Sequence, residues 1–276
     1  MSKPPRVAYM GPARSFSHAA ALRMFGPHGD FLETRTIPDA IEAAGSGDAD
    51  LAIVPIENST EGGVNATLDA LFDNHVTISA ELVLDIELCL LARSADIGQI
   101  RRVASHPQPL GQCKQWLRQH LPNAEVVVAP STTAAAQDAL RDPHTAAVGS
   151  RLAAELGLVI VRERIQDHEG NATRFVVVGK VAAPPTGNDK TTLVFTTPHE
   201  RGALRRVLEV FDAEGLNLTR IESRPLRGQL WEYAFFTDLE GHRDDAPVAR
   251  ALSRLTEIGA RVRVLGSYPR AIPTKP

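Results

Sequence analysis

The chain has 276 residues, of which 43% are hydrophobic and 23% are charged, as expected for a soluble globular protein with room for two modest domains. Its 30 basic and 33 acidic side chains give a net charge of −3, so it has no basic field to hold a nucleic-acid backbone. No apolar run reaches membrane-spanning length and residues 1–5 precede a predicted strand without a signal-peptide core, so we expect a cytoplasmic protein that binds neither nucleic acid nor membrane.

The first two-thirds of the chain alternate short apolar strands with helices. The pattern predicts strands at 7–9, 31–36, 51–54, 102–104, 124–129, 146–149, 159–165 and 173–179, with a long extended segment at 76–91. Helices are predicted from Ser15 or Ser17 to 25, from 36, over 65–72, over 107–121, from Ser131 to 140, and from Ser150. This alternation predicts a three-layer α/β fold with mostly parallel strands.

The pattern changes after residues 181–189, which have the composition of a linker. Strands at 191–197, 218–224, 232–239 and 261–267, with helices at 202–214 and 247–258, give the order β-α-β-β-α-β. That order is the ferredoxin-like arrangement, and its small size favours a regulatory module over a second enzyme core.

Residues 167–179 form a polar loop that leads directly into an apolar strand. Thr173 and Arg174 open this strand, so a hydroxyl and a cation lie where a buried sheet meets a loop, a common place for ligands in α/β proteins. The structural alternative is a Thr at a strand start and an Arg in a surface ion pair.

Polar or small residues also fill five junctions between strands and helices, at 14–17, 58–65, 105–108, 131–133 and 149–150. Each junction alone is explained by helix capping, but together they offer several N–H groups and helix N-termini to an anionic small molecule. The sequence contains no phosphate loop, dinucleotide fingerprint or G-x-S-x-G elbow, which favours a carboxylate ligand over a nucleotide and disfavours a serine hydrolase.

Neither Cys89 nor Cys113 belongs to a metal-binding or redox spacing, and the nine histidines show no HxH or HExxH pattern. We therefore expect two reduced thiols, no metal site and no cofactor.

Five motifs, in order, resemble those of monofunctional prephenate dehydratase with a C-terminal ACT domain. They are residues 54–59 with Glu61-Gly62, residues 105–108 with Gln112-Cys113, Asn171 with residues 173–175, residues 202–204, and residues 222–225. The resemblance covers nearly the whole chain. It implies decarboxylation and dehydration of prephenate to phenylpyruvate, in phenylalanine biosynthesis, with feedback inhibition by L-phenylalanine.

The same resemblance implies a catalytic domain at 1–182 with two lobes, like a type II periplasmic binding protein. Lobe one would comprise about 1–96 and 167–182, lobe two about 97–166, with a linker at 183–189 and an ACT domain at 190–270. Thr173 would lie at the hinge between the lobes. No chorismate mutase segment precedes Val7, so a monofunctional enzyme is expected, as a homodimer or homotetramer.

The resemblance also assigns residues to roles. Thr173 would help the leaving hydroxyl depart, with Glu57 and His106 as candidate ultimate proton donors. The implied substrate-binding residues are Ser15, Phe16, Asn58, Ser59, Asn171, Arg174 and Phe175. The implied phenylalanine-binding residues are Gly202, Ala203, Leu204, Glu222, Ser223, Arg224 and Pro225, placed between the ACT domains of two chains.

Two positions leave alternatives open. On a regular strand Arg174 faces away from Thr173, so it contacts substrate only if the strand start is twisted; otherwise it pairs with an acid near the hinge. Arg14 stands where the family usually has Gly, so either the loop differs or Arg14 adds a cation for a substrate carboxylate. The competing functions are arogenate dehydratase, which performs the same elimination on the aminated substrate, and a non-catalytic amino-acid sensor.

Overall fold

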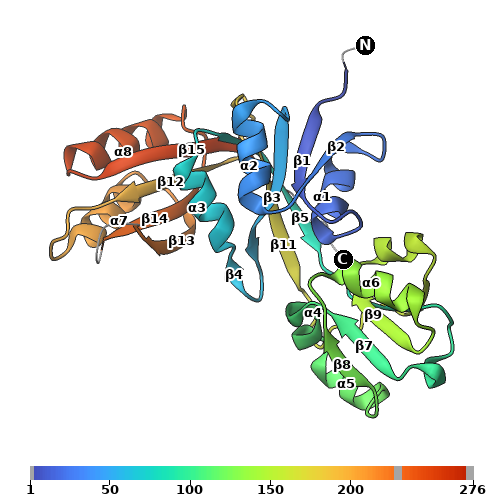
Figure 1. Ribbon diagram of the computed structural model, residues 1–276. Helices are drawn as coiled ribbons and strands as arrows, with labels where there is room; N and C mark the ends of the chain where they lie inside the picture. The colour runs from blue at the N-terminus through green and yellow to red at the C-terminus, as the bar shows by residue number, and fades with distance from the viewer. Residues whose placement is uncertain (1–2, 227–231, 272–276) are drawn as a thin grey trace.

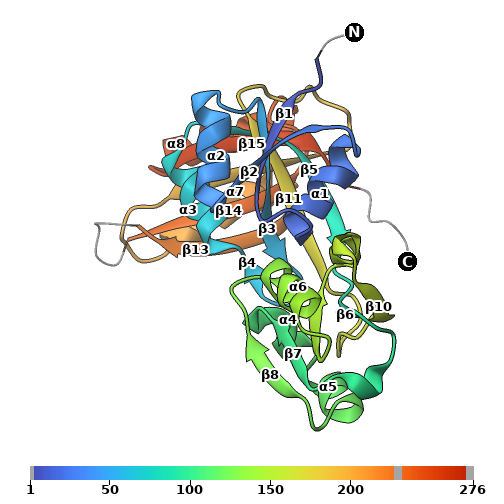
Figure 2. The same ribbon diagram turned by 45° about the vertical axis from the view of Figure 1, so that its right-hand side comes forward.

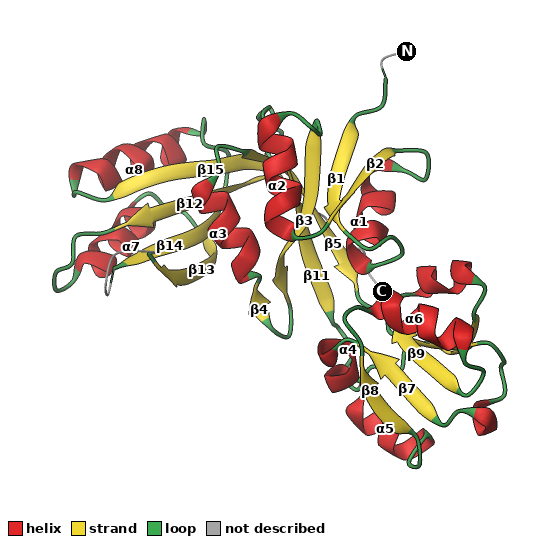
Figure 3. Ribbon diagram, viewed as in Figure 1, coloured by secondary structure: helices red, strands yellow, loops and turns green. Residues whose placement is uncertain are grey.

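The computed structural model describes residues 3–226 and 232–271 of the chain. Figure 1 shows three bodies in a row: the C-terminal domain, a first lobe in the centre, and a second lobe at the other end. Each body has its own sheet, with helices packed against it (Figure 3). The predicted two-lobed α/β domain followed by a smaller domain is therefore confirmed.

The first lobe contains a mixed sheet of strand order β2-β1-β3-β11-β5, with the short β4 paired to β3. Its strands are β1 (Arg6–Met10), β2 (Asp30–Thr34), β3 (Leu51–Asn58), β4 (Gly62–Gly63), β5 (Thr77–Asp85) and β11 (Ala172–Gly179), and its helices are α1 (Phe16–Phe25), α2 (Ile37–Ser46) and α3 (Asn65–Asp73). The β1–β2 and β1–β3 pairs are parallel, whereas β11 runs antiparallel to both of its neighbours. The sheet is thus less parallel than the alternation predicts, because β11, which comes from far along the chain, is inserted antiparallel between β3 and β5.

Strand β3 continues through Pro55 to Asn58, four residues beyond its predicted end. Pro55 lacks an N–H group, which normally excludes proline from the interior of a sheet. Here β3 pairs with β1 only as far as Ile53, and its pairing with β11 shifts register at Phe175, opposite Pro55. The irregular register accommodates the proline and carries the strand on to Glu57 and Asn58.

The second lobe contains a sheet of strand order β10-β6-β9-β7-β8. Its strands are β6 (Cys89–Ala92), β7 (Arg102–Ser105), β8 (Glu125–Val128), β9 (Thr145–Gly149) and β10 (Val159–Arg162); its helices are α4 (Pro107–Gln112), α5 (Lys114–His120) and α6 (Thr132–Arg141), with the 3-10 helices η1 (Ile97–Gln99) and η2 (Arg151–Leu156). Ser131 caps α6 as predicted, with its Oγ accepting from the Ala134 N–H at 3.0 Å.

The single helix predicted over 107–121 is two short helices that break at Cys113. The Gln112 carbonyl accepts a hydrogen bond from the Asp167 N–H at 2.7 Å. The Asp167 carboxylate in turn accepts from the N–H groups of Gln115 and Trp116, each at 2.9 Å. Asp167 therefore caps the start of α5 from a distant part of the sequence.

The chain crosses between the lobes twice. It leaves the first lobe after β5 ends at Asp85 and enters the second at Cys89, earlier than the predicted crossing near residues 92–98, because β6 pairs with β9 and β10. It returns between β10 and β11, and β11 leads from the second lobe up into the first (Figure 2). The predicted second crossing near Asp167 falls within this return.

The C-terminal domain has the predicted order β-α-β-β-α-β and a sheet of order β13-β14-β12-β15. Its elements are β12 (Asp189–Thr196), α7 (Ala203–Ala213), β13 (Leu218–Pro225), β14 (Tyr233–Glu240), α8 (Ala246–Glu257) and β15 (Arg261–Pro269). Leu193, Phe195, Val207 and Phe211 belong to the core under the two helices.

The opposite face of this sheet joins the core of the first lobe, where Val194, Phe236 and Tyr268 pack in one cluster with Val176 and Ile78. Strand β15 passes very close to β5, since a Cβ added at Gly266 would lie 2.1 Å from the Ile78 carbonyl oxygen. The first lobe and the C-terminal domain therefore share a continuous, close-packed interface. Within the described residues no helix is long and apolar enough to cross a membrane.

Candidate active site

Asn58 and Thr173 face each other where β3 ends and β11 begins, at the junction of the two lobes. The Asn58 Nδ2 group donates to Thr173 Oγ1 at 2.9 Å and to Asn171 Oδ1 at 2.9 Å. All three side chains are buried, with residue exposures of 7–9%. The structure thus brings together three of the predicted site residues, although 115 positions separate Asn58 from Thr173.

The orientation of the Asn58 amide is fixed by the loop that follows it. Its Oδ1 accepts from the N–H and hydroxyl of Thr60, at 3.0 and 2.6 Å, and from the Glu61 N–H at 3.2 Å. The Nδ2 donors must therefore point at Thr173 and Asn171. Because Thr173 Oγ1 accepts this hydrogen bond, its own hydrogen remains available to donate to a ligand.

Asn171 joins the two lobes by donating from Nδ2 to Gln112 Oε1 at 3.1 Å. Gln112 is the last residue of α4 in the second lobe. Because its Oε1 accepts from Asn171, its Nε2 group points away from Asn171 and can donate to another group. Gln112 was part of a recognised sequence motif but was not among the predicted site residues. Its signal was the position of a polar amide five residues after Pro107.

Ser59 holds the loop that precedes β11. Its Oγ donates to the Gly170 carbonyl at 3.1 Å and accepts from the Ala172 N–H at 3.0 Å, while its own N–H donates to the Ala172 carbonyl at 2.9 Å. These bonds fix the backbone on both sides of Asn171.

The loop at Ala13–Ser15 bridges the lobes on another side. Ser150 Oγ donates to the Arg14 carbonyl at 2.7 Å, and Thr133 Oγ1 donates to the Ala13 carbonyl at 3.2 Å. Ser15 caps α1 by accepting from the His18 N–H at 3.3 Å. Phe16, the next residue, packs against the core of the second lobe.

Arg14 adopts the left-handed conformation that the family glycine would favour, with φ of 69°. Its side chain forms an ion pair with Glu155 of the second lobe at 3.7 Å. The loop thus keeps the glycine-like backbone, and the guanidinium lies near a carboxylate of the protein without a hydrogen bond from its Nε.

His18 supports this loop from inside. Its Nδ1 accepts from the Arg14 N–H at 3.0 Å, and its ring stacks on Tyr9 with centroids 5.0 Å apart. Burial, followed by the charge of Arg14, lowers the pKa of His18, which keeps Nδ1 free to accept. Burial and the neighbouring Glu33 raise the pKa of Tyr9 to about 12.

His106 lies at the start of α4, directly after the buried Ser105, and its side chain is exposed. Ser105 donates to the Val148 carbonyl at 2.6 Å, which ties the end of β7 to β9. His106 therefore follows a fixed strand end, and no described contact joins its side chain to Thr173.

Three other predicted site residues point elsewhere. Arg174 and Glu57 lie on the faces of β11 and β3 opposite Thr173 and Asn58, and Arg174 donates from Nε to Glu57 Oε2 at 3.0 Å. This placement does not support Glu57 as a proton donor or Arg174 as a substrate ligand. It agrees with the alternative in which Arg174 pairs with an acid near the hinge. Phe175 is 2% exposed and packs with Tyr9 and Ile53 in the sheet core, so its placement differs from the predicted substrate contact.

Both cysteines are free thiols, as predicted, and both are buried. Burial raises the pKa of the Cys113 thiol to about 12, which makes it a poor nucleophile. Across the residues that the structure describes, no three His, Cys, Asp or Glu side chains are grouped to hold a metal ion.

The predicted effector residues lie on two elements of the C-terminal domain. Gly202, with φ of 80°, begins α7 and is followed by Ala203 and Leu204. Glu222 on β13 faces the first lobe at Gly63 and pairs with Arg220, while the neighbouring Ser223 is exposed.

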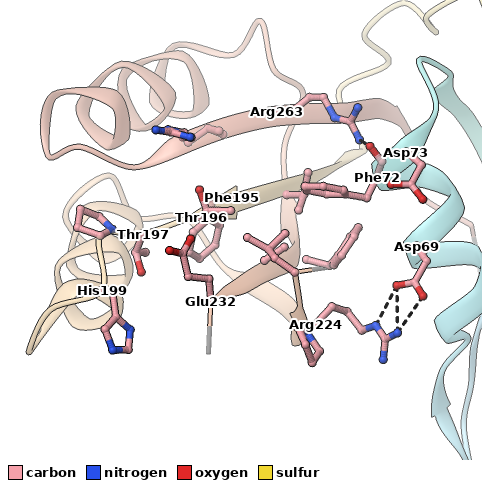
Figure 4. A pocket seen from close by; sticks show the side chains of 18 of the residues that line it. Asp69, Phe72, Asp73, Phe195, Thr196, Thr197, His199, Arg224, Glu232 and Arg263 are labelled. Atoms are coloured by element: carbon pink, nitrogen blue, oxygen red, sulfur yellow. Dashed lines mark hydrogen bonds and ion pairs between the residues drawn. The ribbon is translucent and has the colours of Figure 1, made fainter. Parts of the chain in front are cut away.

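Arg224 and Pro225 line a cavity of about 820 Å³ between the C-terminal sheet and α3 (Figure 4). Arg224 closes one side by pairing with Asp69 at 3.0 Å, and Arg263 and Phe72 lie on another side. This cavity is separate from the junction at Thr173, since none of the Thr173 partners lines it.

The junction at Thr173 offers a hydroxyl with a free hydrogen and amide groups from both lobes. Such a set of neutral donors suits an anionic substrate and can deliver a hydrogen bond to a leaving oxygen.

Comparison with known proteins agrees with this reading. The family model "Prephenate dehydratase" matches residues 7–183, and the model "ACT domain" matches residues 191–257. A prephenate dehydratase of Mycolicibacterium smegmatis is 43% identical over 280 residues, covering 96% of this chain and 90% of that protein.

Two solved structures share the whole fold. Prephenate dehydratase from Arthrobacter aurescens in complex with L-Phe has a TM-score of 0.88 at 38% identity, covering 96% of this chain and 90% of the other. GqqA, described as a novel type of quorum-quenching acylase, has a TM-score of 0.87 at 32% identity, covering 96% and 98%.

Proposed function

This chain belongs to the prephenate dehydratase family, and we propose that it converts prephenate to phenylpyruvate with loss of carbon dioxide and water. The observation that carries the proposal is the hydrogen-bonded set of Asn58, Asn171 and Thr173 at the junction of the two lobes. It combines a polar site for an anion with a hydroxyl that is oriented to donate.

Thr173 provides the acid assistance in this reaction. Loss of the carboxylate as carbon dioxide pushes an electron pair into the ring, and the ring hydroxyl leaves at the opposite carbon. The Asn58 amide donates to Thr173 Oγ1, so the Thr173 hydrogen is free to donate to the departing oxygen. Because aromatisation drives the reaction, a positioned hydrogen-bond donor is sufficient help, and His106 is the candidate that resupplies the proton.

The remaining substrate contacts come from both lobes. Asn171, Ser59 and Gln112 provide oriented polar groups at the hinge, and Ser15 lies at the start of α1 on the bridging loop. The hydrogen bonds between the lobes already hold these groups together, and a substrate bound between them would be shielded from water, which strengthens its hydrogen bonds.

We also propose that L-phenylalanine binds the ACT domain and inhibits the enzyme. The support is the ACT match, the relative solved with L-Phe, and the glycine-led start of the eleven-residue helix α7, where exposed N–H groups suit a carboxylate. Residues 202–204 and 222–225 are the candidate contacts. The site would lie between two chains, so the protein would be at least a dimer. We propose a homodimer or a homotetramer, located in the cytoplasm.

The test is to supply purified protein with prephenate and with arogenate, and to follow phenylpyruvate and phenylalanine. Phenylpyruvate from prephenate supports the proposal. Product from arogenate alone would assign the chain to arogenate dehydratase, and product from neither substrate would support a sensor or the acylase chemistry described for GqqA.

A further inference from the structure

A cluster of charged side chains connects β11, the strand that carries Thr173, to the ACT domain. At its centre, Arg174 on β11 lies among three carboxylates from three other strands. Its Nε donates to Glu57 Oε2 on β3 at 3.0 Å, its Nη1 to Glu81 Oε2 on β5 at 3.2 Å, and its Nη2 to Asp238 Oδ2 on β14 at 2.6 Å. The side chains of Arg174, Glu81 and Asp238 are 9%, 2% and 1% exposed, so these two pairs are shielded from water, whereas Glu57 is 36% exposed.

Asp238 is the carboxylate that the ACT domain contributes to this cluster. Its side chain is 1% exposed. Its second oxygen, Oδ1, accepts from the Thr192 hydroxyl at 2.6 Å, and Thr192 is itself bonded to the Tyr268 hydroxyl at 2.6 Å. The carboxylate is thus held rigidly by its own domain and aimed at Arg174.

The other two carboxylates are shared with further cations. Lys190 Nζ binds Glu81 at 2.8 Å, and Arg220 Nε lies 3.9 Å from Glu57. Among the ion pairs of the described residues, Arg174 is the one cation that contacts Asp238. Burial by itself lowers the pKa of a guanidinium, but Asp238 and the other anionic groups outweigh it and raise the pKa of Arg174, so the guanidinium stays charged.

Two members of this cluster are the sequence neighbours of Thr173 and Asn58, the proposed catalytic pair. Arg174 directly follows Thr173, and Glu57 directly precedes Asn58. Since neighbouring side chains on a strand point to opposite faces, the ion pair on one face and the Asn58–Thr173 hydrogen bond on the other are fixed by the same two backbones. The β3–β11 ladder shifts register at the next residue, so backbone hydrogen bonds alone specify the strand less firmly there.

We propose that Asp238 of the ACT domain is a positioning residue for the dehydration reaction. It holds Arg174, and Arg174 with Glu57 holds the ends of β11 and β3 so that Thr173 and Asn58 keep their catalytic geometry. This inference rests on the proposed function, because it takes turnover of prephenate as its measure.

The first test compares Asp238→Asn with the wild type. Asparagine keeps the size and the acceptor for Thr192 but removes the charge that holds Arg174. Since a displacement of about 1 Å can cost roughly 10²-fold in rate, we expect kcat to fall by about 10- to 100-fold with KM changed by less than about twofold. A change confined to KM would contradict the positioning role.

Arg263→Met is the matched control, because Arg263 is another contact between the two domains. It donates to the Leu71 and Phe72 carbonyls at the end of α3, at 2.5 and 2.9 Å, and makes no contact with Arg174 among its described hydrogen bonds. This variant should weaken docking of the ACT domain yet keep the wild-type kcat. Equal losses of kcat in Arg263→Met and Asp238→Asn would show a general effect of docking and overturn the inference.

A double-mutant cycle with Arg174→Gln gives the second test. If Asp238 acts through Arg174, the double variant should lose no more kcat than the worse single variant. Multiplied losses would mean independent action and would overturn the proposal. Each kcat is measured per folded molecule, well below the melting temperature of that variant.

Thr192→Val is the fallback if Asp238→Asn does not fold, because it leaves the charge but releases the carboxylate; a several-fold fall in kcat is expected. Wild-type turnover with unchanged kcat in the folded variants would overturn this inference alone. Absence of turnover by the wild type would overturn the proposed function and this inference with it.

Discussion

Asn58 has the most demanding role at the scale of single residues, since one amide orients both Thr173 and Asn171. Asn58→Asp keeps the acceptor for Thr60 and Glu61 but turns an oxygen toward the Thr173 hydroxyl. That oxygen would take the hydrogen proposed for the leaving group, so kcat should fall by roughly 10²-fold, within the range for losing a positioned proton donor.

The control for this variant is Asn74→Asp, the same chemical change at the end of α3, where Asn74 Nδ2 donates to the Ala70 carbonyl. It should cost about 0.3–1 kcal/mol of stability from the helix dipole and leave kcat alone. Steady-state kinetics decide the matter, and a wild-type kcat in Asn58→Asp would remove Asn58 from the acid machinery.

Arg14 allows the cost of a left-handed residue to be measured directly. Arg14→Gly and Arg14→Ala both lose the pair with Glu155, but only glycine is free of the steric penalty at φ of 69°. We expect the glycine variant to be more stable than the alanine variant by about 1 kcal/mol, judged by urea unfolding. Equal stabilities would mean that the loop relaxes when the side chain is removed.

Sequence reasoning placed Thr173, Asn58 and Ser59 near one site, but it could not give their contacts. The Asn58–Thr173 hydrogen bond depends on β11 inserting antiparallel between β3 and β5, and nothing local specifies that pairing. The side of the strand on which Glu57 lies was also not predicted, because the strand was expected to end at residue 54. Extending β3 past Pro55 turns Glu57 toward Arg174 and Arg220 and Asn58 toward Thr173.

At the scale of elements, the contact between β15 and β5 sets how closely the ACT domain packs on the first lobe. Gly266→Ala would put a Cβ 2.1 Å from the Ile78 carbonyl oxygen, and the other nearest atoms also belong to the Ile78 backbone, which cannot rotate away as a side chain could. Overpacking of this kind typically costs about 1–3 kcal/mol, and we expect a loss in that range in thermal or chemical unfolding.

Gly111→Ala is the matched control because Gly111 lies in α4 and an added Cβ would meet nothing within 4 Å. In that helix alanine should stabilise the chain by about 0.5–1 kcal/mol. If Gly266→Ala were as well tolerated as Gly111→Ala, the two strands would not pack as closely as described.

Element boundaries followed the sequence where the signals were local. Thr36 and Asp39 form the capping box of α2, and Ser131 caps α6, at the predicted positions. The break between α4 and α5 was missed because its cause, Asp167, comes from the segment between β10 and β11, about fifty residues along the chain. The early crossing at residues 86–88 was missed for a similar reason, since the extended segment 76–91 contains no signal that divides it between two sheets.

At the scale of the whole molecule, the proposed control by L-phenylalanine predicts reciprocal coupling between the ACT domain and the cleft. Phenylalanine should inhibit with a coupling free energy on the order of 1–3 kcal/mol, and saturating substrate analogue should weaken phenylalanine binding by the same factor. Calorimetry with and without the analogue measures both directions.

Gly202→Val should lose this response, because a β-branched side chain is strained at φ of 80° and covers the start of α7. Gly215→Val carries a similar strain at φ of 68°, in open space beyond the far end of α7, and should keep the response. Full inhibition of Gly202→Val, or no phenylalanine binding to the wild type, would contradict the proposed effector site.

The most direct test of the central claim is steady-state formation of phenylpyruvate from prephenate by the wild type and by Thr173→Ala, side by side. We predict that the wild type forms phenylpyruvate. In the variant, kcat should be lower by roughly 10² to 10⁴ with little change in KM, because a positioned donor is lost while the binding groups remain. A wild type that makes no phenylpyruvate, or a Thr173→Ala variant with unchanged kcat, would contradict the claim.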